Sequence, residues 1–132
     1  MTILVAYVPR PEGQAALEKG IEIAKSRNEH LVVVNASLDG TKEDASLVDA
    51  QDFERIELML ANTGLSAEVK QYVRGKSVVE EIESLVESLQ VSMLIIGLRK
   101  RTPVGKLIMG SVAQEILLSV SCPVLAVKAG GW

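Results

Sequence analysis

The sequence predicts an α/β protein in which five parallel strands form one doubly wound sheet. Short apolar runs alternate with amphipathic segments along the whole chain, in the order strand, helix, strand, helix. Short strands joined by helices require a parallel sheet with helices on both faces. The third strand is polar enough to occupy an edge, so we expect the strand order 3-2-1-4-5.

Length and composition bound this prediction. The 132 residues suffice for one domain with a hydrophobic core, so we expect a single domain over residues 1–132. Hydrophobic residues make up 48% and charged residues 23%, as in a folded soluble protein. The sequence contains no apolar run long enough to span a bilayer and does not begin like a signal peptide. We therefore expect a cytoplasmic protein.

Charge and rare residues exclude several function classes. The formal net charge is -3 and aromatic residues are only 3%, which disfavours nucleic acid as a partner. The single Cys122 and single His30 leave too few ligands for a zinc site and no histidine-dependent triad, because His30 is predicted in a surface turn. We therefore expect no metal site, and a packing role for Cys122.

The first three elements follow from apolar patterns. Residues 3–8 (ILVAYV) and 31–35 (LVVVN) are continuous branched runs, typical of strands covered on both faces. Between them, residues 12–28 carry apolar and small side chains at helical spacing, which predicts an amphipathic helix. The residues on its apolar face are Leu17, Gly20, Ile21 and Ala24.

The middle of the chain begins with residues 37–45, whose charges and Gly40 predict an exposed connection. A helix then ends near residues 62–64, with Phe53, Ile56 and Leu60 on its inner side. Residues 67–73 mix apolar side chains with three polar ones, which predicts the strand at the sheet edge.

The remaining elements continue the alternation. Ser77 and Glu80 stand at capping-box spacing, so we expect a helix over residues 78–89. Residues 93–96 (MLII) form the fourth strand, which is predicted to stop at Gly97. A glycine-punctuated loop to Gly110 then precedes a helix, and the last strand begins at Val124 and ends at Val127. The residues predicted to face inward from that helix are Ala113, Ile116, Leu117 and Val120.

The predicted strand order places a candidate ligand site. The sheet reverses its winding between the first and fourth strands, and ligands of doubly wound sheets bind outside the carboxyl ends of the strands at that reversal. The segments to consider are therefore residues 9–13 and 97–110.

The second of these segments is cationic. No Asp or Glu occurs between Ser88 and Gln114, and the four basic residues in this stretch are Arg99, Lys100, Arg101 and Lys106. Gly110 and Ser111 close the loop where the next helix starts, so free backbone N–H groups and the helix dipole would favour an anion there. A glycine at position 97 would let a planar or sugar group approach the backbone.

The alternative is that the cations are solvated and that Ser111 is an ordinary N-cap. Two known phosphate loops are excluded: a Walker A pattern would need Gly and Ser or Thr where Lys100 and Leu107 stand, and no GxGxxG follows the first strand. Any phosphate site must therefore use another loop.

The spacing of this loop resembles that of the universal stress protein family. The family pattern is Gly, two residues, Gly, nine residues, Gly, then Ser or Thr, and here Gly97 and Lys100 are followed after nine residues by Gly110 and Ser111. The resemblance extends to VGKLIMGSVAQEIL (104–117), CPVLAV (122–127) and ILVAY (3–7). The chain is therefore identified as a single-domain member of that family.

The resemblance implies a Rossmann-like, adenine nucleotide alpha hydrolase-like fold that binds ATP or another adenine nucleotide. It also implies a homodimer paired through residues 124–127 and a regulatory role in stress survival, without a general catalytic reaction. The positions that match the family's phosphate and ribose contacts are Gly97, Gly110, Ser111 and the backbone of Val112, with Val34 near the base. To these, charge alone adds Arg99, Lys100, Arg101 and Lys106.

Two departures from the family pattern leave a second hypothesis open. Val8 stands where nucleotide-binding members commonly have an Asp, and Lys100 replaces the second glycine of the loop. The chain could therefore be a dimeric interaction module that binds no nucleotide. A third hypothesis is a slow ATPase or phosphotransferase, which the lack of a carboxylate or histidine in the loop disfavours.

Overall fold

The computed structural model describes residues 1–35, 50–71, 77–101, 106–108 and 111–129. Of residues 50, 99–101, 106–108 and 111 it describes only the backbone. The helices are α1 (Pro11–Arg27), α2 (Ala50–Ala61), α3 (Val78–Ser88) and α4 (Ser111–Ser119). The strands are β1 (Thr2–Tyr7), β2 (His30–Asn35), β3 (Ala67–Gln71), β4 (Val91–Arg101), β5 (Lys106–Ile108) and β6 (Val124–Lys128).

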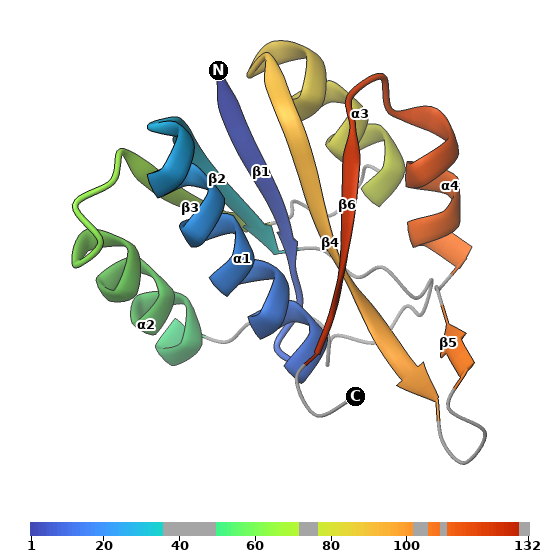
Figure 1. The fold of residues 1–132 in the computed structure, drawn as a ribbon, viewed down its shortest axis with the longest axis horizontal. Helices are drawn as coiled ribbons and strands as arrows, with labels where there is room; N and C mark the ends of the chain where they lie inside the picture. Colours follow the sequence, from blue (N-terminus) through green and yellow to red (C-terminus); the bar gives the residue numbers. More distant parts are fainter. Residues whose placement is uncertain (36–49, 72–76, 102–105, 109–110, 130–132) are drawn as a thin grey trace.

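Five of the strands form a parallel sheet in the order β3-β2-β1-β4-β6 (Figure 1). This arrangement confirms the predicted order 3-2-1-4-5, with β6 as the fifth strand of the prediction. All six residues of β1 are buried, because it lies at the centre with a helical layer on each face. The described part of β3 alternates half-buried and exposed residues, as expected of an edge strand.

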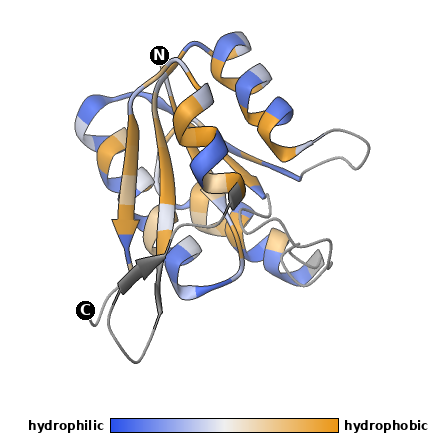
Figure 2. Ribbon diagram, turned by 90° about the vertical axis from the view of Figure 1, so that its right-hand side faces the viewer, coloured by the Kyte–Doolittle hydropathy of each residue, from blue (hydrophilic) through white to orange (hydrophobic). Residues whose placement is uncertain are grey.

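The helices cover the sheet in two layers, with α1 and α2 on one face and α3 and α4 on the other (Figure 1). The two cores follow from the alternation of side chains along each strand. In β1, Ile3 and Val5 pack against the first pair of helices, whereas Leu4 and Ala6 pack against the second pair. Figure 2 shows the strands as the most hydrophobic part of the molecule and the helices as mixed.

The start of α3 and the end of α1 have residues that commonly cap helices. The Ser77 hydroxyl oxygen accepts a 3.1 Å hydrogen bond from the Glu80 amide, which confirms the predicted N-cap of α3. Helix α1 ends at Asn28 in the left-handed conformation (φ 53°), which Asn tolerates better than most residues do. Gly20 lets α1 approach β1 closely, since a Cβ there would overlap the Val5 side chain.

The largest correction concerns the segment after Gly97. Strand β4 was predicted to stop at that residue, but it continues to Arg101 and pairs with β5 in an antiparallel hairpin. Residues 99–101 are all basic, so their sequence favours an exposed loop when only the burial of apolar side chains is considered. Pairing with β5 satisfies the backbone N–H and C=O groups without an apolar face, so the segment forms a strand.

Two smaller predictions were also wrong. Leu117 was expected to face inward, but it is 45% exposed, while Ala113 and Ile116 are buried. Helix α4 packs beside α3 at the edge of the sheet, so its buried stripe is narrower than the sequence indicates. His30 is the first residue of β2 rather than part of a turn, and its Nδ1 lies 2.8 Å from the Ser66 hydroxyl.

The predicted exposed connection (37–45) and the last two residues of the predicted third strand (72–73) lie outside the described residues. Within the described ranges, none of the helices combines the length and apolar character that crossing a bilayer requires.

Candidate functional site

The candidate site lies at the carboxyl edge of the sheet, where β1 and β4 are neighbours. The chain leaves β1 for α1 on one face, and it leaves β4 through the hairpin for α4 on the other face (Figure 1). This divergence is the reversal of winding that the sequence predicted. Ligands of doubly wound sheets bind at such a point because the two crossovers leave a crevice between them.

The turn from β1 into α1 is tight. The Arg10 amide donates a 2.8 Å hydrogen bond to the Val8 carbonyl, and Pro11 starts the helix, where its missing N–H costs nothing. Gly13 then brings the helix against the strand end, since a Cβ there would overlap the Val8 carbonyl. The first turn of α1 is therefore held against the end of β1.

Gly97 makes a second close approach at this edge. A Cβ on Gly97 would overlap the carbonyl group of Glu12, the second residue of α1. From the sequence, the absence of a side chain at Gly97 was expected to admit a ligand. The structure instead places the backbone of α1 on that side, so Gly97 locks α1 against β4.

Two buried polar side chains also lie at this edge. Among the described residues, the buried polar or charged ones are Thr2, Glu12 and Asn35, and the last two are at the carboxyl end of the sheet. The Asn35 carboxamide donates a 3.0 Å hydrogen bond from Nδ2 to the carbonyl of Tyr7, the residue beside it in the register of β1 and β2. Asn35 therefore ties the ends of the two strands together.

A polar cluster joins β1 to the start of α2. The Arg55 guanidinium lies 2.8 Å from the Asp52 carboxylate and donates a 3.2 Å hydrogen bond to the Tyr7 hydroxyl. That hydroxyl in turn donates a 3.4 Å bond to Asp52. Burial, and secondarily the Asp52 charge, raises the pKa of Tyr7 above its ordinary value of 10.0. The cluster holds α2 against the end of β1, since Asp52 and Arg55 lie in its first turns.

The hairpin brings the predicted cations together on two short strands. Arg101 pairs with Lys106, Lys100 with Leu107 and Arg99 with Ile108. Directly paired residues share a face and alternate residues of a strand do too, so the positions of Arg99, Arg101 and Lys106 share one face of the hairpin. Lys100 has a position on the opposite face.

The other predicted site residues have different surroundings. Val34 is one residue from the end of β2, is only 1% exposed, and is paired with Ala6 of β1 and Lys70 of β3, so it presents no exposed side chain to a ligand. Ser111 is the first residue of α4, and Val112 is half-buried against the core. Gly110 lies outside the described residues. Burial raises the pKa of Cys122, which is consistent with a packing role.

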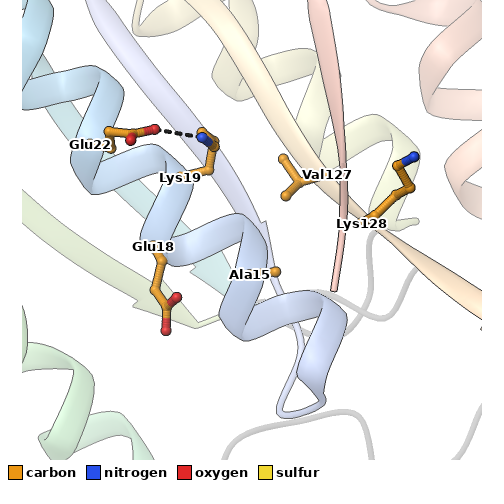
Figure 3. Close-up of a pocket in the computed structure, with 6 residues that line it drawn as sticks. All are labelled: Ala15, Glu18, Lys19, Glu22, Val127 and Lys128. Carbon is orange, nitrogen blue, oxygen red and sulfur yellow. Dashed lines mark hydrogen bonds and ion pairs between the residues drawn. The ribbon is translucent and has the colours of Figure 1, made fainter. Parts of the chain in front are cut away.

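A shallow groove lies between α1 and β6 (Figure 3). No residue of the predicted nucleotide site lines it. Its lining residues are Ala15, Glu18, Lys19, Glu22, Val127 and Lys128, and an ion pair joins Lys19 to Glu22 at 2.6 Å.

Comparison with known proteins identifies the family. A sequence model of the universal stress protein family matches residues 1–128. A universal stress protein from Mycolicibacterium smegmatis is 42% identical over 130 residues, covering 98% of this chain and 99% of that protein. The chain belongs to the universal stress protein family.

Solved universal stress proteins share the fold. A universal stress protein from Archaeoglobus fulgidus superposes with a TM-score of 0.74 at 28% identity, covering 96% of this chain and 97% of that one. The structure of the universal stress protein from Archaeoglobus fulgidus in complex with dAMP gives a TM-score of 0.70 at 22% identity, covering 96% of both chains.

In this universal stress protein, several residues at the carboxyl edge were not predicted from the sequence. Asn35 is the polar end of an otherwise apolar run, which was a usable signal. Glu12 gave no such signal, because an acidic residue in the first turn of a helix is common for reasons of the dipole alone. The contacts of Tyr7 with Asp52 and Arg55 join residues more than 40 positions apart, which no local pattern encodes.

Proposed function

We propose that this chain binds an adenine nucleotide, ATP or a related compound, at the carboxyl edge between β1 and β4. In this proposal it acts as a cytoplasmic, nucleotide-responsive regulator in the stress response, through a partner protein. The observation that carries the proposal is the divergence of α1 and α4 from neighbouring strands of a universal stress protein fold. The dAMP complex of the Archaeoglobus fulgidus protein, which shares this fold, supports an adenine nucleotide as the ligand class.

The phosphate end of the nucleotide belongs near the hairpin. Arg99, Arg101 and Lys106 share a face of it by register, and α4 begins three residues after β5 ends. Cationic side chains and the free N–H groups of a helix start are complementary to phosphate oxygens. Of the family-matched positions, Gly110, Ser111 and Val112 follow the hairpin in the sequence, whereas Gly97 packs against α1. Val34, near the end of β2, is the position matched to the base.

The test is calorimetry of the purified protein with ATP, ADP and AMP, after denaturation of a sample to detect any nucleotide that co-purifies. Ser111→Ala and Arg99→Ala are expected to weaken binding, each by roughly tenfold, the factor for one hydrogen bond to a charged group. Ser119→Ala at the other end of α4 and Arg27→Ala at the other end of the sheet are matched controls. No heat with any of the three nucleotides refutes the proposal.

The proposed regulator is a homodimer paired through β6, whose one partner strand among the described residues is β4. We expect its other edge to pair with a second copy, because an edge strand presents backbone N–H and C=O groups that another strand can bind. Sedimentation equilibrium tests this part, and a monomer at micromolar concentrations contradicts it. This result bears only on the proposed homodimer and leaves nucleotide binding to the calorimetry.

A second candidate function is a dimeric interaction module without nucleotide. Two observations favour it: Val8 is 5% exposed and offers no polar side chain at the end of β1, and α1 occupies the space beside Gly97. A dimer that survives while nucleotide binding is undetectable would support this function. Gain of binding in Lys100→Gly would then identify the Lys100 side chain as the obstacle.

For both candidate functions we propose that the chain does not turn over a nucleotide. A slow ATPase or phosphotransferase would release phosphate above a buffer blank, and a sustained rate that disappears in Ser111→Ala would contradict this proposal.

A further inference from the structure

Among the described residues, Glu12 is the one charged residue that is buried, with an exposed fraction of 8%. A buried carboxylate costs free energy unless it is well bonded, so its place in the fold needs a reason. It lies in the first turn of α1, at the divergence of β1 and β4, which is the proposed nucleotide site. The opposite edge of the sheet has Thr2 as its buried polar side chain, which is neutral.

The position of Glu12 relative to β4 is fixed by Gly97. The carbonyl of Glu12 packs against Gly97, and the Cβ of Glu12 lies 3.0 Å from the point where a Gly97 Cβ would stand. The Glu12 side chain therefore starts between α1 and β4. Two residues further along β4 is Arg99, about 7 Å along the strand, where the cationic hairpin begins.

We infer that the Glu12 carboxylate accepts hydrogen bonds from the ribose hydroxyls of the bound nucleotide. This inference rests on the proposed function and assigns one residue's role within it. A carboxylate only accepts hydrogen bonds, so it repels phosphate and suits a group that donates. In a nucleotide, the hydrogen-bond donors adjacent to the phosphates are the ribose hydroxyls. This order matches the short distance along β4 from Gly97, beside Glu12, to the first basic residue of the hairpin.

Glu12 already has a polar partner within the protein. Its two oxygens together offer about four acceptor sites, so a second donor can be accommodated beside the first. The competing explanation is that Glu12 only complements the positive end of the α1 dipole. In that role, Glu12 would contribute equally to the binding of nucleotides with and without ribose hydroxyls. If Glu12 binds the ribose, its contribution should be lost when the hydroxyls are absent.

The experiment measures the affinities of AMP and 2′,3′-dideoxy-AMP by calorimetry for three proteins: wild type, Glu12→Met and Glu18→Met. Methionine keeps the length of the side chain and removes the acceptor. Glu18 is exposed on the same helix, so Glu18→Met is the matched control. Wild type and Glu18→Met are expected to prefer AMP by about tenfold or more, as for a charge-assisted hydrogen bond, and Glu12→Met by less than about twofold.

Different outcomes separate the two proposals. No binding of either compound to wild type refutes nucleotide binding and the role of Glu12 with it. Equal affinities in wild type, or a preference that persists in Glu12→Met, refute only the role of Glu12. If Glu12→Met weakens both compounds equally, the residue acts through the helix and the inference is again wrong.

Glu12→Gln provides a second variant if Glu12→Met does not fold, as judged by circular dichroism. It keeps the shape and a neutral acceptor, so the preference for AMP is expected to shrink several-fold without vanishing. A preference unchanged from wild type in Glu12→Gln overturns the inference.

Discussion

Up to Ile96, strand β4 lies between β1 and β6 under two helical layers, whereas beyond Leu98 the same strand pairs with β5 in an antiparallel hairpin. The first part is held by burial, since Leu94, Ile95 and Ile96 are all 0% exposed. The second part is held by backbone hydrogen bonds to a three-residue strand. One strand thus combines a segment that is buried in the core with a segment that is held by backbone pairing outside it.

The largest expected effect is in the buried part. Ile95→Ala removes a fully buried side chain of β4 from the core that α1 covers, so we expect a loss of about 4 kcal/mol in the free energy of unfolding, measured by urea denaturation. Leu118→Ala, at 86% exposure, is the control and should change stability by less than about 0.5 kcal/mol. Similar losses in the two variants would contradict the division of β4 by burial.

The next effect is at the boundary. Gly97→Ala places a Cβ against the Glu12 carbonyl, and because backbone cannot rotate away, we expect a loss of about 3 kcal/mol. Gly64→Ala meets open space at φ 76° and should lose only about 1 kcal/mol, from backbone strain. Equal losses would mean that α1 is not locked against β4 through Gly97.

A smaller effect concerns the polar cluster at the end of β1. Tyr7→Phe removes hydrogen bonds to Asp52 and Arg55, which should cost about 1 kcal/mol at pH 7. The raised pKa means that the folded state holds the phenol proton more tightly than the unfolded state does. The wild type should therefore lose stability as the pH rises above 10.0, through the pKa of the folded state.

Urea denaturation between pH 8 and pH 11 tests this pH dependence. Tyr7→Phe lacks this group, so the gap between the two proteins should narrow in that range. A gap that stays constant would show that the Tyr7 hydroxyl titrates normally.

The smallest effect on stability is expected in the hairpin. The triple change Arg99→Gln, Arg101→Gln and Lys106→Gln should alter the free energy of unfolding by less than about 0.5 kcal/mol, because strand pairing there uses the backbone. The same protein should bind nucleotide more weakly, with a shallower dependence on salt. A loss of stability above about 1 kcal/mol would show that these side chains also hold the fold.

The elements that the sequence predicted well are those in which burial and local chemistry agree. The apolar runs before Tyr7 and Asn35 marked β1 and β2, the polarity of β3 placed it at an edge, and Ser77 marked the start of α3. The hairpin was missed because residues 98–101 show no burial pattern, and strand formation there depends on a partner strand that hydrophobicity does not reveal.

The sequence by itself determined the family, the order of the strands, the reversal between β1 and β4, and the cluster of cations after Gly97. These properties are local patterns, or follow from packing rules that apply to any such alternation. Only the tertiary structure decided which residues meet at the carboxyl edge. Two contacts join distant segments: the backbone of Glu12 against Gly97, and Tyr7 with the polar cluster of α2. Both contacts depend on how α1 and α2 pack on the sheet. The positions of these helices are determined by the packing of whole layers, which no short stretch of sequence encodes.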